Sequence, residues 1–149
     1  MRYRYYLNIG TNLGNREQNQ QSAITALSEG AERVVVSDVV RSEPWGFASA
    51  NEFLNVGIAL DSPLEPHAML EHIHKLEKEL GSASHRDATG AYIDRLIDID
   101  IMAIASDDGT EITISTPTLT VPHPHLNTRP FFLTPYHQLK EREKERKKE

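Results

Sequence analysis

The chain has 149 residues, of which 38% are hydrophobic and 26% are charged, a composition typical of a globular domain with its own core. Its net charge of −6 and pI of about 5.6 argue against nucleic-acid binding, which usually needs a basic surface. Cysteine is absent, which excludes disulfides and thiolate metal sites. The first residues lack the apolar run of a signal peptide. We therefore expect a cytoplasmic protein without a membrane or nucleic-acid partner, and a monomer by default.

Apolar spacing separates strands from helices along the chain. Residues 53–60 alternate between two faces, as expected for a strand. Residues 66–80 carry apolar side chains at intervals of three and four, with Pro66 in the first turn, as expected for a helix. By these criteria, and in chain order, the expected elements are strand 3–9, helix 16–29, strand 34–40, strand 53–60, helix 66–80, strand 97–102 and helix 131–139.

This order of elements, βαββαβ, predicts an α+β protein with a ferredoxin-like antiparallel sheet and both helices on one face. The opposite face would be covered only by loops and would hold the functional site. We expect residues 1–139 to form a single domain. Residues 140–149 are almost all Lys, Glu and Arg without an apolar face, so we expect a frayed tail.

The segment 95–103 is the most informative part of the sequence. In a strand, the isoleucines at alternate positions point into the core, and Asp98 and Asp100 project together from the other face. Two carboxylates this close repel each other unless a cation lies between them. The pattern is also typical of a purely structural strand with one wet face. If functional, the pair suits Mg²⁺ that is also bound to substrate phosphates, with Arg95 nearby as a phosphate-binding cation.

Other segments supply groups that phosphoryl transfer and heterocycle binding require. Cations are available at Arg86 and Arg129, and His123 can donate a hydrogen bond to a phosphate. Aromatic rings are available for a flat ligand, and the amide of Asn55 can pair with the edge of a base-like ring.

Together these motifs resemble the 6-hydroxymethyl-7,8-dihydropterin pyrophosphokinase family. No single motif is specific, but they occur in family order and cover most of the chain. The matching segments are 9–14 (IGTNLG), 41–46 (RSEPWG), 53–55 (FLN), 76–81 (LEKELG), 95–101 (RLIDIDI), 121–123 (VPH) and 129–131 (RPF).

The resemblance implies transfer of pyrophosphate from ATP, the co-substrate, to the hydroxymethyl group of the reduced pterin, with release of AMP. It also implies two Mg²⁺ ions held by Asp98 and Asp100, and Arg95 as a catalytic arginine. Such a reaction needs alignment and charge neutralisation more than covalent help.

The resemblance further assigns the binding residues. Those expected to contact ATP are His74, Glu77, Arg95, Ile101, Thr120, His123 and Arg129. Those expected to contact the pterin, by ring stacking or through hydrogen bonds, are Ser42, Glu43, Trp45, Phe53, Asn55, Tyr92 and Phe131.

The chain departs from the family pattern in the polar loop 82–94. The family has two arginines in this loop, and here neither position holds arginine. Arg86 is the one nearby candidate to replace them as a catalytic residue, and Tyr92 stands where the family has tryptophan. Loss of an arginine that acts only in the transition state would lower the rate and leave binding intact. One alternative is therefore a catalytically weakened relative that still binds ATP and pterin. A Mg²⁺-dependent hydrolase on the same scaffold is a second alternative, which the sequence favours less.

Overall fold

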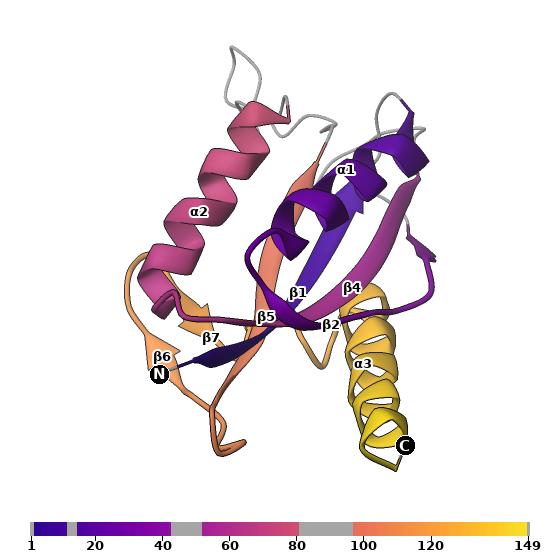
Figure 1. Cartoon of the computed structure of the whole chain (residues 1–149). Coiled ribbons are helices and arrows are strands. Elements are labelled where there is room, and N and C mark those ends of the chain that lie inside the picture. Colours follow the sequence, from indigo (N-terminus) through magenta and orange to yellow (C-terminus); the bar gives the residue numbers. More distant parts are fainter. Residues whose placement is uncertain (1, 12–14, 43–51, 81–96, 149) are drawn as a thin grey trace.

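The computed structural model describes residues 2–11, 15–42, 52–80 and 97–148, and shows an α+β fold (Figure 1). None of the helices in these ranges is long and apolar enough to span a membrane. The strands are β1 (Tyr3–Thr11), β2 (Glu32–Val36), β3 (Val40–Ser42), β4 (Phe53–Ser62), β5 (Asp98–Ser106), β6 (Ile114–Ser115) and β7 (Thr120–Val121). The helices are α1 (Arg16–Ser28), α2 (Pro66–Glu79) and α3 (Pro130–Lys148).

The main sheet is antiparallel, with strand order β2-β4-β1-β5, and β3 also pairs with β4. The strand expected over 34–40 is divided into β2 and β3. The division occurs at Ser37, whose side-chain oxygen accepts the backbone N–H of Gly57 at 2.7 Å in place of a carbonyl of the ladder. A separate two-stranded sheet joins β6 to β7.

One face of the sheet is covered by α1 and α2, as the sequence predicted (Figure 1). The alternating residues expected to point inward do so: Leu7 of β1, Ile58 of β4 and Ile99 of β5 belong to one core cluster. The helices contribute their apolar stripes, including Ile73, which is fully buried. Burial of a large aliphatic side chain stabilises the fold by about 1.5–3 kcal/mol, so this layer fixes which strand face points away from the helices.

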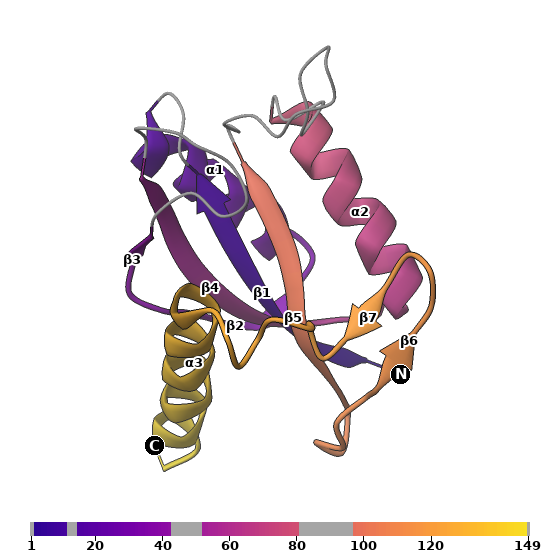
Figure 2. The ribbon, with the colours of Figure 1, turned by 180° about the vertical axis from the view of Figure 1, so that it is seen from behind.

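The sequence analysis expected only loops on the opposite face, and this expectation is wrong. Helix α3 packs across part of that face (Figure 2). Leu139 and Phe132 of α3 lie in a second core cluster with Tyr6 and Ala59 of the sheet. The close approach depends on Gly57, where a Cβ atom would lie 2.9 Å from Leu139 Cδ1. The remainder of this face stays open beside the first turn of α3.

The charged tail also differs from the expectation of a frayed end, because α3 continues to Lys148. Its stability comes from contacts with the sheet that lie far away in sequence. Arg4 is buried and donates to Glu143 Oε1 at 2.8 Å and to Asp61 Oδ1 at 3.0 Å. Tyr6 donates its hydroxyl to the other oxygen of Glu143 at 2.9 Å. The α3 clamp, as we call Arg4, Tyr6, Asp61 and Glu143, thus holds the second half of the helix.

We expect Glu143→Gln to lower the free energy of unfolding by about 2 kcal/mol, because the buried Arg4 loses one of its two charged partners. Urea denaturation of both proteins measures the difference. Glu141→Gln on the exposed side of the same helix is the matched control and should change stability by less than about 0.5 kcal/mol. Equal effects of the two substitutions would contradict the role of the α3 clamp.

Candidate active site

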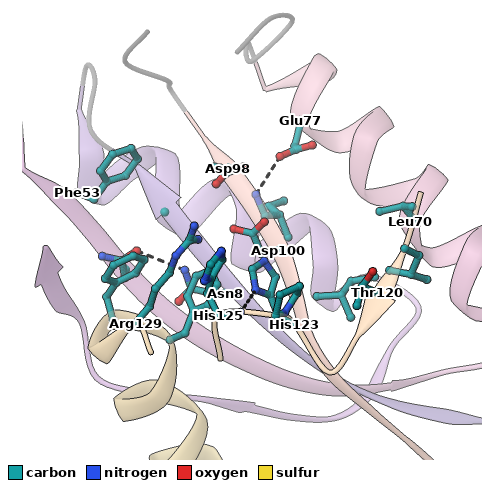
Figure 3. Close-up of a pocket in the computed structure, with 18 of the residues that line it drawn as sticks. Asn8, Phe53, Leu70, Glu77, Asp98, Asp100, Thr120, His123, His125 and Arg129 are labelled. Carbon is teal, nitrogen blue, oxygen red and sulfur yellow. Dashed lines mark hydrogen bonds between the residues drawn. The ribbon is translucent and has the colours of Figure 1, made fainter. Parts of the chain in front are cut away.

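A cavity of about 740 Å³ lies on the open part of the second sheet face (Figure 3). The elements around it are β1, β3, β4, β5, β7, α2 and the first turn of α3. Every predicted site residue that the structure describes lines this cavity: Ser42, Phe53, Asn55, His74, Glu77, Asp98, Asp100, Ile101, Thr120, His123, Arg129 and Phe131.

The floor of the cavity is set by the pairing of β1 with its two neighbours. Gly10 pairs with Asn55 on one side and with Asp98 on the other. Asn8 likewise lies between Gly57 and Asp100. A Cβ atom on Gly10 would lie 3.3 Å from Asn55 Oδ1 and 3.4 Å from the Phe53 ring, so the missing side chain keeps the floor open. The register thus brings the amide and the two carboxylates of the site within reach of one ligand.

Asp98 and Asp100 are half-buried and project from β5 into the cavity (Figure 3). Ile99 between them belongs to the core cluster beneath α1 and α2. The backbone N–H of Ile99 donates to Glu77 Oε2 at 2.9 Å. Glu77 is only 5% exposed, so this bond fixes the peptide between the two aspartates to the second half of α2. Glu77 therefore positions the carboxylate pair, in addition to lining the cavity.

The imidazole of His123 is held in one tautomer by the backbone around it. Its Nδ1 accepts the backbone N–H of His125 at 3.0 Å, so the proton of the neutral ring is on Nε2. Burial, followed by the nearby Arg129 and His125, lowers the pKa of His123 to about 4, and Asp98 opposes this shift. At neutral pH, His123 is therefore a neutral donor through Nε2.

Arg129 stands just before the first residue of α3 and provides a cation at the cavity wall. Its guanidinium carbon lies 5.1 Å from the centre of the Phe132 ring and 5.7 Å from that of Phe131. These contacts orient the guanidinium through cation–π attraction. Because Phe132 is buried in the core beneath α3, the packing of this helix determines where the cation lies.

Asn55 lies on β4 with its amide in a network of fixed polarity. Its Nδ2 donates to Val40 O at 3.2 Å and to Ser42 Oγ at 2.8 Å, and its Oδ1 accepts from Asn8 Nδ2 at 3.3 Å. The rings of Phe53 and Phe131 are also on the cavity wall. A flat heterocycle could therefore contact aromatic surface and a hydrogen-bonding amide in the same space.

Five predicted site residues, Glu43, Trp45, Arg86, Tyr92 and Arg95, lie outside the described residues, and their roles stay predictions. The structure adds cavity residues that the sequence analysis did not name, notably Asn8, Gly10 and His125. Period-two alternation along β1 could have identified the first two, because they alternate with the core positions Leu7 and Ile9. For His125, the signal was its position in the Pro- and His-rich segment that ends before α3.

Comparisons with known proteins agree with the resemblance seen in the sequence. Residues 6–141 match the family model described as 7,8-dihydro-6-hydroxymethylpterin-pyrophosphokinase. The chain is 36% identical over 131 residues to the 2-amino-4-hydroxy-6-hydroxymethyldihydropteridine pyrophosphokinase of Porphyromonas gingivalis, covering 87% of this chain and 86% of that one. The enzymes of the same name from Aquifex aeolicus and Bacillus subtilis are 37% and 31% identical, over 87% of this chain and 76% and 74% of theirs.

We expect the ring of His123 to titrate with a midpoint of about 4 in the ligand-free protein. Because the unfolded state takes up this proton near pH 6.5 and the folded state only near 4, the contribution to stability is present above pH 6.5 and is lost as the pH falls to 4. NMR titration of the histidine ring protons measures the midpoint, and His123→Gln assigns the resonance. A midpoint above 6.5 would contradict the neutral tautomer.

Proposed function

Because the chain belongs to the 7,8-dihydro-6-hydroxymethylpterin-pyrophosphokinase family, and is an ATP-dependent pyrophosphokinase, we propose that the cavity beside α3 is its active site. The reaction transfers pyrophosphate from ATP to 6-hydroxymethyl-7,8-dihydropterin in folate biosynthesis and releases AMP. The observation that carries the assignment is the convergence of all described site predictions, from six elements and the loop before α3, on this cavity.

The pterin occupies the end of the cavity near β3 and β4 in this proposal. Asn55 hydrogen-bonds its ring, and Phe53 and Phe131 offer aromatic faces. Ser42 acts through the Asn55 amide, to which its hydroxyl is bonded at 2.8 Å. Stacking between aromatic groups contributes about 0.5–1.5 kcal/mol beyond area burial, so two rings and one fixed amide are a sufficient basis for recognition.

ATP occupies the end lined by α2, β5 and β7. His74, Ile101 and Thr120 line this part, which supports their proposed contact with the nucleoside. His123 and Arg129 lie toward the first turn of α3, and in this proposal they bind the phosphates, one as a neutral donor and the other as a cation. A hydrogen bond is stronger when the donor or the acceptor is charged, and the phosphate oxygens are charged acceptors. Both side chains therefore favour the triphosphate over an uncharged ligand.

The paired aspartates fit Mg²⁺ if substrate phosphates and water supply the remaining ligands of the ion. The described residues contain no group of three or more His, Asp or Glu side chains that could hold a metal ion. Asp98 and Asp100 alone supply two carboxylates, and Mg²⁺ commonly binds through one or two carboxylates, with substrate phosphates and water completing its shell. The site therefore suits ions that arrive with ATP. Two Mg²⁺ bound here would neutralise the phosphate oxygens at which charge develops.

The protein's own groups supply alignment. The Asn55 network holds the pterin at one end, and Arg129 and His123 hold the phosphates at the other, so the hydroxymethyl oxygen and the β-phosphorus are brought to reacting distance. Glu77 keeps the peptide between Asp98 and Asp100 rigid, which maintains the spacing of the two carboxylates. Groups held in advance need no reorganisation during the reaction, and such electrostatic preorganisation is the main contribution that proteins make to phosphoryl transfer.

The remaining features of the proposal concern the whole molecule. The strand order β2-β4-β1-β5, with α1 and α2 on one face, supports a ferredoxin-like βαββαβ arrangement to which α3 is added. We further propose that the enzyme acts in the cytoplasm as a monomer.

The deciding experiment measures AMP formation from ATP and 6-hydroxymethyl-7,8-dihydropterin, with Mg²⁺ and with EDTA. We expect AMP only when the pterin and Mg²⁺ are both present. AMP formed without pterin would indicate the hydrolase. Binding of ATP or pterin in calorimetry without AMP formation would support the catalytically weakened relative. The absence of both binding and turnover would overturn the proposal.

We expect Asp98→Ala and Asp100→Ala each to reduce turnover by at least about 100-fold, because the metal-binding pair is lost. Initial rates of AMP release at saturating ATP and Mg²⁺ provide the test. Asp107→Ala in the exposed turn after β5 is the control and should keep the normal rate. A near-normal rate in either cavity variant would contradict the metal assignment.

A further inference from the structure

Asn8 is a buried amide on the central strand that the reaction described above does not use. It is 2% exposed, lines the cavity, and lies in register between Gly57 of β4 and Asp100 of β5. Asparagine is depleted in strands, and burying its amide costs desolvation free energy. A side chain of this kind therefore needs a hydrogen-bond partner that offsets the cost. Its partner is Asn55, which accepts its Nδ2 hydrogen at 3.3 Å.

The orientation of the Asn55 amide follows from the backbone. Val40 O can only accept a hydrogen bond, so the group of Asn55 that faces it at 3.2 Å must be the NH₂. The second hydrogen of the same NH₂ is directed to Ser42 Oγ at 2.8 Å. Both donors of Asn55 are therefore used within the protein, and only its Oδ1 remains to interact with a ligand.

The orientation of Asn8 follows in turn from that of Asn55. A flip of the Asn8 amide would bring two carbonyl oxygens together, so Asn8 must present its NH₂ to Asn55 Oδ1. In this orientation Asn8 Oδ1 is buried and has no hydrogen-bond partner among the described residues. An unpaired buried acceptor costs about 1–3 kcal/mol, so the orientation of Asn8 serves Asn55 and not its own hydrogen bonding.

We propose that Asn8 is a positioning residue: Val40 O sets the polarity of the Asn55 amide, and Asn8 holds its carbonyl oxygen in place as an acceptor over Gly10, so that the substrate group bound there is a hydrogen-bond donor. The proposal rests on the proposed function, because it takes the bound ring to be the reduced pterin. Asn55 Oδ1 lies where a Cβ of Gly10 would be 3.3 Å away, so the bare glycine leaves space for a ring N–H to approach the free lone pair. Asn8 thus contributes to specificity without touching the substrate.

The kinetic test compares Asn8→Leu, which has a similar volume but no donor, with the wild type. We expect the KM for 6-hydroxymethyl-7,8-dihydropterin to rise about tenfold, because the Asn55 carbonyl oxygen loses the hydrogen bond that holds it over Gly10 and is out of position part of the time. The KM for ATP should change by less than twofold. An unchanged KM for the pterin, or an equal rise for both substrates, would overturn the proposal.

A matched control separates positioning from loss of a buried amide. Gln20 is 5% exposed and donates to Leu54 O at 3.2 Å, and it is not among the residues that line the cavity. Gln20→Met also removes a buried amide that contacts β4 and should leave both KM values unchanged. If it raised the KM for the pterin as much as Asn8→Leu does, the Asn8 effect would be one of stability alone.

A second variant and a measurement without turnover complete the test. Asn8→Asp keeps the shape of the side chain but places an acceptor against Asn55 Oδ1, so it should raise the KM for the pterin at least as much. In ¹⁵N-labelled, ligand-free protein, the Asn55 side-chain NH₂ protons should exchange slowly in the wild type and at least about tenfold faster in both variants. Slow exchange in the variants would refute the positioning role. Absence of AMP formation by the wild type would refute only the proposed function.

Discussion

The antiparallel pairing of β1 with β4 and β5 is the constraint on which the rest of the site depends. Strand β1 is buried on both faces, with Leu7 and Ile9 in the core beneath α1 and α2. Because successive side chains alternate, the same pairing that buries these residues directs Asn8 and Gly10 to the cavity. A slip of one residue would exchange the two sets, so the hydrophobic core on one face specifies the polar floor on the other.

The helix that covers the second face connects stability to the site. Phe132 lies in the first turn of α3 and packs in the core, and Arg129 just before it is oriented over this ring. Fourteen residues into the helix, Glu143 is held by Arg4 and Tyr6. The two ends of α3 thus have different tasks: the α3 clamp fixes the direction of the helix axis, and the first turn carries the cation to the cavity wall.

Sequence patterns predicted the helices α1 and α2 and the three long strands β1, β4 and β5, because each has its own periodic signal. The aspartate pair followed from the same alternation, and the ligand-binding residues followed from the resemblance. The position of α3 could not be predicted, because its second half is anchored by a pair 139 residues apart, Arg4 and Glu143, and not by an apolar stripe. Periodicity also cannot reveal the division between β2 and β3, which arises when Ser37 bonds to Gly57. Alternation along β1 can place Asn8 on the cavity face, but it cannot reveal the hydrogen bond to Asn55, a partner 47 residues away.

Hydrogen-bond polarity in the cavity is set by backbone groups. The carbonyl of Val40 determines which end of the Asn55 amide faces the ligand, and the N–H of His125 determines which nitrogen of His123 carries the proton. The N–H of Ile99 binds Glu77 and so fixes the strand between the two aspartates. Val40 and Ile99 lie in the sheet and His125 lies in the turn before α3, where these backbone groups are held in place, so each of these side chains presents one fixed donor or acceptor before any substrate binds. Such preorganisation favours the transition state, because the protein does not have to spend free energy on turning its dipoles during the transfer.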